Sequence, residues 1–369
     1  MKSVCIRLFA TAAALAVGLA ASAEAAEIKI GIVAPMSGQF ASEGQDWVNA
    51  INLAFSKVNA KGGAAGNTIT TVSGDDACDP QQGVAAASKL VSDGVVAVVG
   101  GYCSGGVLPT LKIYGDAGIP FVIVAANSTK LVTANPGNAF LIDSTGDAQA
   151  LTAIGLLKKK GLKSVAIVDE GDAYSSDLSK ITAAEFEKAG GKVAAKETVA
   201  SGEQDFSSLV SRIKASKADA VFWTAYYGDG ALLTKQLRQS GYQGAIVLGD
   251  GNNSPEYLQI AGSAAEGAYL MSPPVLEFLP DAKAFTQDYK QAAGRDPGAY
   301  AALAYDGASL IADAISRAKS TDSKAVVAAL KASDFQGLAG RIKFTDKNTL
   351  VGSNFAILQV SDGKWKPVN

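Results

Sequence analysis

The feature that most constrains the fold is a repeated alternation of short apolar runs with longer amphipathic stretches after residue 27. Several of the short runs are almost continuous in valine, isoleucine and alanine, as expected for parallel strands covered on both faces. Many of the longer stretches end at a glycine, as in Lys61-Gly62 and Ala189-Gly190, where glycine accepts the left-handed conformation that ends a helix. Strand, helix and strand at this spacing predict an α/β protein with right-handed crossovers.

The pattern predicts these elements in order. The expected strands are Ile28–Val33, Thr68–Val72, Val95–Val99, Pro120–Val124, Ala139–Ile142, Ser164–Val168, Lys192–Lys196, Ala220–Thr224, Ala245–Leu248, Gly267–Met271, Arg341–Thr345 and Phe355–Val360. The expected helices are Asp46–Asn59, Pro80–Ser92, Gly106–Ala117, Ala148–Lys160, Ser176–Ala189, Phe206–Ala215, Gly230–Ser240, Asp281–Ala293, Tyr300–Lys319 and Ser323–Ala332.

The 369 residues suggest about two domains, since a domain usually takes ~100–200 residues. The alternation breaks near Asp143–Asp147 and again near Ser272–Pro274, and a complete second set of strand–helix units lies between the breaks. We therefore expect two doubly wound parallel-sheet lobes. One comprises residues 27–146 plus 273–350 and the other residues 147–272 plus 351–369. The alternative is a single large sheet with added helices.

The N-terminus has the pattern of a secretory signal peptide. Lys2 and Arg7 precede an apolar stretch without charge, and small residues follow it up to Ala26. Ala21-Ser22-Ala23 and Ala23-Glu24-Ala25 both fit the cleavage pattern, so we assign residues 1–25 to the signal. A membrane anchor is the alternative, but the uncharged stretch is shorter than the ~20 residues that span a bilayer. We expect an exported, periplasmic protein with no stable membrane insertion.

Composition and charge exclude several classes of function. The 33 lysines and arginines nearly balance the 35 acidic residues, for a net charge of −2, so no basic field is available for nucleic acid. The chain has no histidine, which removes Ser-His-Asp triads, Cys-His pairs and histidine-bound zinc. We expect neither enzymatic activity nor a cofactor.

Export leaves two cysteines, Cys78 and Cys103, in a compartment where a disulfide persists. A bond between them would join two glycine-rich loops. Two buried thiols are the alternative.

The loops at the carboxyl ends of the expected strands are the candidate site, since ligands of open parallel sheets bind there. The first lobe offers hydroxyls and backbone N–H groups, at Ser104 and Ala125–Asn127, which suit a ligand carboxylate. The second offers Asp250 and Tyr226, which suit an ammonium group. Taken singly, each of these residues could equally be a helix cap or a turn residue.

Other motifs are weaker. Gly62-Gly63-Ala64-Ala65-Gly66 follows a helix instead of a strand, so it indicates a turn and no dinucleotide loop. Asp75, Asp76 and Asp79 suggest a cation site, but their spacing does not match a calcium loop. Asp75 and Asp76 would point to opposite sides of a strand end, which argues against a catalytic pair.

The loops also carry a family resemblance. Its motifs are Ile30-Gly31-Ile32-Val33-Ala34-Pro35-Met36-Ser37-Gly38, Asn59-Ala60-Lys61-Gly62-Gly63, Asp75-Asp76-Ala77-Cys78-Asp79-Pro80, Tyr102-Cys103-Ser104, Asp205-Phe206-Ser207-Ser208-Leu209-Val210 and Ala261-Gly262-Ser263-Ala264-Ala265-Glu266-Gly267. In this order, over residues 27–369, they resemble the periplasmic leucine-isoleucine-valine-binding proteins of ABC importers.

The resemblance implies a type I periplasmic binding protein fold, with two lobes, three hinge crossings and a ligand in the cleft. It implies that Ser104 and Ala125, Ala126 and Asn127 bind the ligand carboxylate, that Tyr226 and Asp250 bind its ammonium group, and that Cys78 and Cys103 form the family disulfide. Tyr102, Tyr174 and Tyr300 fall where the family lines the side-chain pocket.

Three departures bear on the ligand. Glu43 takes a pocket-wall position where a branched-chain binder of the family has an aromatic side chain, and a buried carboxylate beside an aliphatic ligand is costly. Asn127 replaces a usual threonine, and the segment around Asp250 is about one residue shorter.

The resemblance implies an exported solute-binding protein that captures a free amino acid, branched-chain or related, and delivers it to a membrane permease. We expect a monomer. An amide, urea or aromatic acid as ligand is one alternative, and a ligand-sensing domain is another.

Overall fold

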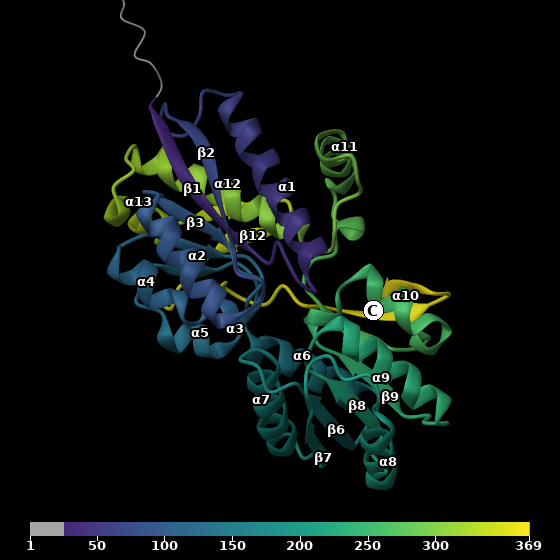
Figure 1. Ribbon diagram of the computed structural model, residues 1–369. Helices are drawn as coiled ribbons and strands as arrows, with labels where there is room; N and C mark the ends of the chain where they lie inside the picture. The colour runs from purple at the N-terminus through teal and green to yellow at the C-terminus, as the bar shows by residue number, and fades with distance from the viewer. Residues whose placement is uncertain (1–25, 369) are drawn as a thin grey trace, which may run out of the picture.

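The computed structural model describes residues 26–368 and arranges them in two lobes, one above the other in Figure 1. The predicted signal peptide lies outside the described residues. The first lobe contains a five-stranded parallel sheet in the order β2-β1-β3-β4-β5. Its strands are β1 (Glu27–Ala34), β2 (Thr68–Asp75), β3 (Ala97–Gly100), β4 (Phe121–Ile123) and β5 (Ala139–Leu141).

Helices cover both faces of this sheet (Figure 1). Helices α1 (Ala41–Asn59) and α12 (Ala301–Ala318) pack together on one face, and α2 (Pro80–Ser92) and α4 (Thr110–Asp116) lie on the other. Asp79 caps α2, because its carboxylate accepts the N–H groups of Gln81 and Gln82 at 2.9 Å each. The lobe also contains α3 (Ser104–Val107), α5 (Thr129–Ala134), α11 (Ala282–Ala293), α13 (Ser323–Lys331) and the small antiparallel pair β11 (Asp334–Gln336) and β12 (Arg341–Lys343).

The second lobe contains a seven-stranded sheet in the order β14-β13-β10-β9-β8-β6-β7. It is parallel from β7 to β10, and β13 and β14 add to its edge antiparallel. The strands are β6 (Ser164–Asp169), β7 (Lys192–Thr198), β8 (Ala220–Trp223), β9 (Ala245–Leu248), β10 (Tyr269–Ser272), β13 (Ala356–Ser361) and β14 (Lys364–Pro367).

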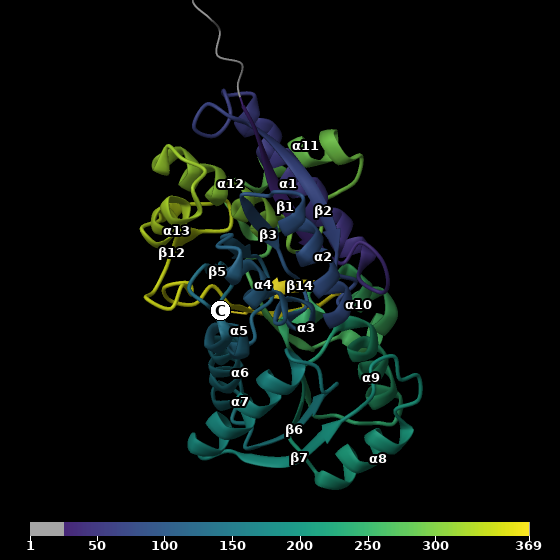
Figure 2. The ribbon, with the colours of Figure 1, turned by 60° about the vertical axis from the view of Figure 1, so that its left-hand side comes forward.

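Helices α6 (Gly146–Lys159) and α7 (Ser175–Lys188) pack on one face of the second sheet, and α8 (Ser207–Ser216) and α9 (Tyr227–Gln239) on the other (Figure 2). The short helix α10 (Pro255–Ala261) packs beside α9. Two sheets, each with helices on both faces, replace the alternative of one large sheet.

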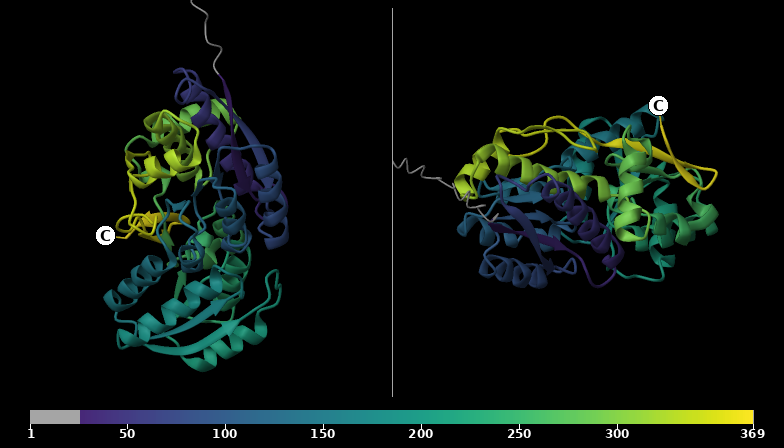
Figure 3. Two further views of the ribbon diagram at one scale, coloured as in Figure 1. Left: turned by 90° about the vertical axis from the view of Figure 1, so that its left-hand side faces the viewer. Right: turned by 90° about the horizontal axis from the view of Figure 1, so that it is seen from above.

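The chain crosses between the lobes three times: after β5, after β10 and before β13. Figure 3 shows the C-terminal segment returning from the upper lobe to the lower one beside the junction. Two of the crossings are tied together, because the N–H of Ser144 donates to the side-chain oxygen of Asn354 at 3.1 Å and the N–H of Asn354 donates to Ser144 Oγ at 2.8 Å.

The predicted elements differ from the observed ones in a few places. The helix expected over Gly106–Ala117 is split into α3 and α4, because Pro109 has no N–H to continue the ladder and Thr110 Oγ1 donates to the Val107 carbonyl. Helices α5 and α10 and strands β11 and β14 were not expected; each is at most seven residues long. Among the described residues, no helix is long and apolar enough to cross a membrane.

Candidate functional site

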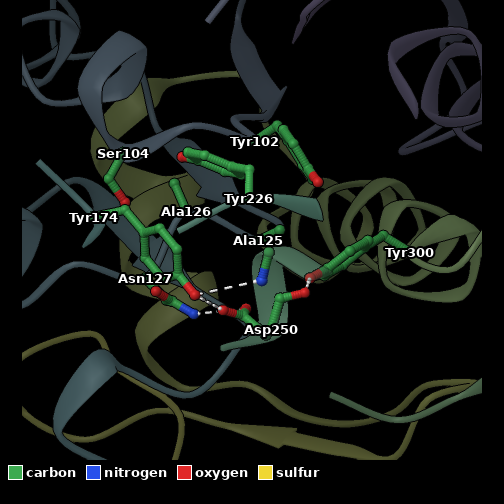
Figure 4. A pocket seen from close by; sticks show the side chains of 10 residues that line it. Tyr102, Ser104, Ala125, Ala126, Asn127, Tyr174, Tyr226, Asp250 and Tyr300 are labelled. Carbon is green, nitrogen blue, oxygen red and sulfur yellow. Dashed lines mark hydrogen bonds between the residues drawn. The ribbon is translucent and has the colours of Figure 1, made fainter. Parts of the chain in front are cut away.

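The carboxyl ends of the strands in both sheets face a cavity of about 230 Å³ between the lobes (Figure 4). Its lining residues are Tyr102, Ser104, Ala125, Ala126, Asn127, Tyr174, Tyr226, Asp250, Gly251 and Tyr300. Nine of the ten site residues expected from the sequence are thus brought together, and Gly251 is an addition. Their roles toward a ligand stay predictions.

The first lobe supplies the donor side of the cavity. Ser104 begins α3 and is buried, and its Oγ accepts the N–H of Ser128 at 3.2 Å. The backbone N–H groups of Ser104 and Asn127 donate to no acceptor in residues 26–368. The hydroxyl of Ser104, which still has its proton to donate, and these two unpaired N–H groups form a surface that suits a carboxylate.

The second lobe supplies a buried carboxyl, that of Asp250, directly after β9. Its Oδ1 accepts the hydroxyl of Tyr174 at 2.6 Å, and its Oδ2 accepts the side-chain amide of Asn127 from the first lobe at 2.9 Å (Figure 4). The hydroxyl of Tyr300 donates to its backbone carbonyl at 2.8 Å. None of the ion pairs formed within the described chain involves Asp250.

Glycine is required before Asp250. A Cβ atom on Gly249 would lie 2.6 Å from the hydroxyl oxygen of Tyr174. Glycine at this position therefore lets the Tyr174 ring reach the carboxyl. This packing explains the glycine that precedes Asp250.

A second buried carboxyl, Asp143, lies on the first crossing between the lobes. Its Oδ2 has no hydrogen-bond partner within the described part of the chain. Sequence analysis named it only at the break in the strand–helix alternation. Burial, and then the neighbouring Asp250, hold the pKa of Asp143 well above its usual value. Burial also raises the pKa of Asp250, against the hydrogen bond from Tyr174. Two adjacent buried carboxyls make this end of the cavity a place where positive charge is favoured.

Glu43 is the one expected site residue outside the cavity lining. It lies in the first turn of α1 and contacts the second lobe outside the cavity. There its carboxyl accepts hydrogen bonds from the hydroxyls of Tyr227 at 3.4 Å and Ser254 at 3.2 Å. The ring of Phe40 packs against Tyr102 and Tyr226 instead, with centroids 5.4 and 4.9 Å apart.

Cys78 and Cys103 form a disulfide, with Cα atoms 5.2 Å apart. The expected pairing is confirmed. Because Cys103 directly precedes Ser104, the bond ties the donor side of the cavity to the loop after β2. The acidic residues of that loop do not form a metal centre: within residues 26–368 no group of three potential ligands is arranged to hold an ion.

A contact beside the cavity joins the two lobes directly. Asp177, on α7 of the second lobe, accepts three hydrogen bonds from the start of α5 in the first lobe through one carboxylate oxygen. The donors are Ser128 Oγ at 2.8 Å, Thr129 N–H at 2.6 Å and Thr129 Oγ1 at 2.8 Å. Sequence analysis missed this residue, since Asp177 and α5 belong to different lobes and no local pattern encodes a contact between them.

We expect Asp177→Ala to weaken ligand binding about 10- to 100-fold, since bonds to a charged group contribute about 1.5–3 kcal/mol and these exist only when the lobes are together. The order of affinities among ligands should not change, because Asp177 does not line the cavity. Titration calorimetry measures both. Lys130→Ala is the matched control: Lys130 makes a single exposed contact across the same interface, to Ser176 at 3.3 Å. An Asp177→Ala protein with wild-type affinity would contradict a role in closure.

We expect Glu43 to make lobe closure depend on pH. Burial, with nearby Glu256 and Asp46, raises the pKa of Glu43 to about 7, whereas a solvated glutamate has a pKa near ~4.3. The closed arrangement therefore binds this proton more tightly than separated lobes would. Closure takes up the proton at intermediate pH and becomes less favourable as the pH rises toward about 7, then levels off.

We expect wild-type affinity to fall several-fold between about pH 5 and pH 8, and Glu43→Gln to reduce this fall, because the amide cannot ionise. Dissociation constants of both proteins at the two pH values test this. Equal slopes for the two proteins would show that Glu43 does not carry the dependence.

The chain is similar to known proteins along most of its length. A family model described as periplasmic binding protein matches residues 27–364. The Leu/Ile/Val-binding protein homolog 2 of Brucella abortus (strain 2308) is 31% identical over 346 residues, covering 92% of this chain and 93% of that protein. The leucine-, isoleucine-, valine-, threonine-, and alanine-binding protein of Pseudomonas aeruginosa is 31% identical over 363 residues, 97% of each chain.

Solved structures agree with these relatives. A leucine-binding protein from Thermotoga maritima superposes with a TM-score of 0.86 at 27% identity, over 93% of this chain and 98% of that one. A branched-chain amino acid transporter substrate-binding protein from Streptococcus pneumoniae, in complex with isoleucine, superposes with a TM-score of 0.83 at 27% identity. The match covers 92% of this chain and 98% of that one. The fold is the type I periplasmic binding protein fold, as the sequence predicted, and the chain belongs to the periplasmic binding protein family, whose members bind ligands and are not enzymes.

Proposed function

We propose that this protein is the periplasmic solute-binding component of an ABC transporter, and that it binds a free amino acid between its lobes and delivers it to a membrane permease. The observation that carries the proposal is the division of the cavity into two ends of opposite character. The Ser104 end offers a hydroxyl and N–H donors to a carboxylate, and the Asp250 end offers a buried carboxyl to an ammonium group.

Binding between the lobes also explains how ligand and closure are coupled. Only the closed arrangement puts Ser104 and Asp250 on one small molecule, so the ligand favours that state by the contacts it gains there. A permease would then distinguish loaded from empty protein by the arrangement of the lobes. The named ligands of the relatives, leucine, isoleucine, valine, threonine and alanine, are all zwitterions of this kind.

One contact favours a second candidate, a ligand without an ammonium group. The Asn127 amide already donates to Asp250 Oδ2, so this carboxyl has a partner within the protein. An amide or a carboxylic acid without an amino group would leave that bond in place.

Titration calorimetry against the twenty amino acids, together with short amides, urea and aliphatic and aromatic acids, tests the proposal. We expect saturable one-to-one binding of at least one amino acid. Binding only of ligands without an amino group would favour the second candidate, and no binding by any amino acid would refute the first.

A further inference from the structure

The wall between the two polar ends of the cavity consists of tyrosine rings. Tyr102 and Tyr300 come from the first lobe, and Tyr174 and Tyr226 from the second (Figure 4). No leucine, isoleucine, valine or methionine of the described chain lines the cavity. The methyl groups of Ala125 and Ala126 are thus the only aliphatic side chains among the described lining residues, so a branched aliphatic ligand side chain would find few aliphatic contacts.

Two of the four phenol hydroxyls are already used, since Tyr174 and Tyr300 donate to Asp250. The hydroxyls of Tyr102 and Tyr226 form no hydrogen bond within residues 26–368, although both residues line the cavity. Burial raises the pKa of both phenols well above the usual value, so each keeps its proton and can donate as well as accept.

Other aromatic rings pack behind the tyrosines and hold them in place. Phe40 packs behind Tyr102 and Tyr226, and Trp47 packs behind Tyr102 and Tyr300, with ring centroids 5.5 and 6.2 Å away. Both supporting rings are buried. The tyrosine rings and the two polar ends therefore enclose a small space, which fits a compact molecule.

Building on the proposed function, we propose that this site prefers an amino acid with a compact, hydrogen-bonding side chain, such as a hydroxyl or a short carboxamide, over a branched aliphatic one. A polar side-chain atom pairs with the hydroxyls of Tyr102 and Tyr226. A leucine or isoleucine side chain would bury both hydroxyls without partners, which a protein site penalises strongly.

The first test is titration calorimetry of the mature protein with serine, threonine and asparagine on one side and valine, leucine and isoleucine on the other. We expect the tightest polar amino acid to bind at least about tenfold more tightly than leucine. A wild-type protein that binds leucine or isoleucine most tightly would overturn the inference and leave the proposed function standing. If no amino acid binds, the proposed function fails and the inference fails with it.

Tyr102→Phe and Tyr226→Phe give the second test, because each removes one hydroxyl and keeps the ring. We expect each to reduce the preference for the polar amino acid over alanine by about fivefold or more, because alanine has no side-chain atom that could pair with the hydroxyl. Tyr114→Phe is the matched control, since it also removes a buried hydroxyl without a partner, at a site outside the cavity. An unchanged preference in both cavity variants would overturn the inference.

Discussion

Asp250→Ala is expected to lose about 2–5 kcal/mol of binding free energy, or roughly 30- to 4,000-fold in affinity. Among the described residues that line the cavity, Asp250 has the only carboxyl, so in the variant a ligand ammonium group would be buried without a charged partner. It also releases the hydroxyl of Tyr174 and the amide of Asn127, which both donate to that carboxyl.

Asp250→Asn removes the negative charge of the side chain and keeps its shape. The amide has nearly the same size, so a similar loss of affinity would assign the effect to the charge. Asp116→Asn is the matched control: its side chain is 68% exposed on α4, where it pairs with Lys112 far from the cavity lining. Titration calorimetry gives the affinities, and thermal unfolding confirms that each variant is folded. Wild-type affinity in Asp250→Ala would show that the ammonium site lies elsewhere.

Replacing Cys78 and Cys103 together with serine is expected to lower the free energy of unfolding by about 3.5 kcal/mol. The two cysteines are 25 residues apart, and the chain-entropy model assigns about this much to a closed loop of that length. The disulfide also holds the loop that carries Ser104 against the loop after β2. Ligand affinity should therefore fall as well.

Urea unfolding of the double variant and of the wild type measures this loss. The wild type in reducing agent is the chemical control, and it should approach the double variant. Cys78→Ser alone should have a similar effect, since it breaks the same bond. Equal unfolding midpoints for wild type and double variant would contradict a stabilising disulfide.

Much of the fold was predictable because most of the strands in the two large sheets have an apolar run of their own, although the short strands β11 and β14 do not. β1, with Ile30 and Ile32 fully buried, was predicted within one residue at each end. The short helices α5 and α10 were not predictable in this way, since six or seven residues are too few to show a helical period. Pro109 lies inside the helix predicted over Gly106–Ala117, and its missing N–H accounts for the break there.

The candidate site was predictable to a similar degree, and for a different reason. Ser104 and Asn127 were expected near one another because the parallel strands of the first sheet end at one edge. Asp250 follows a strand of the second sheet, and the prediction that the two lobes share one ligand placed it opposite them. The family resemblance added Tyr102, Tyr174 and Tyr300. Asp177 could not be predicted, because it reaches α5 only across the gap between lobes, and no local pattern encodes that contact. Asp143 was visible as the end of a strand, but its proximity to Asp250 depends on the hinge.

The central claim is that one small molecule is bound by its two charged ends, and chemical derivatives of the tightest-binding amino acid test it most directly. Its N-acetyl derivative removes the ammonium charge opposite Asp250, and its α-amide removes the carboxylate opposite Ser104. We predict that each derivative binds at least about 100-fold more weakly than the parent amino acid, since each leaves one buried end unpaired. If either derivative binds as tightly as the parent, the end it lacks is not recognised and the claim is wrong.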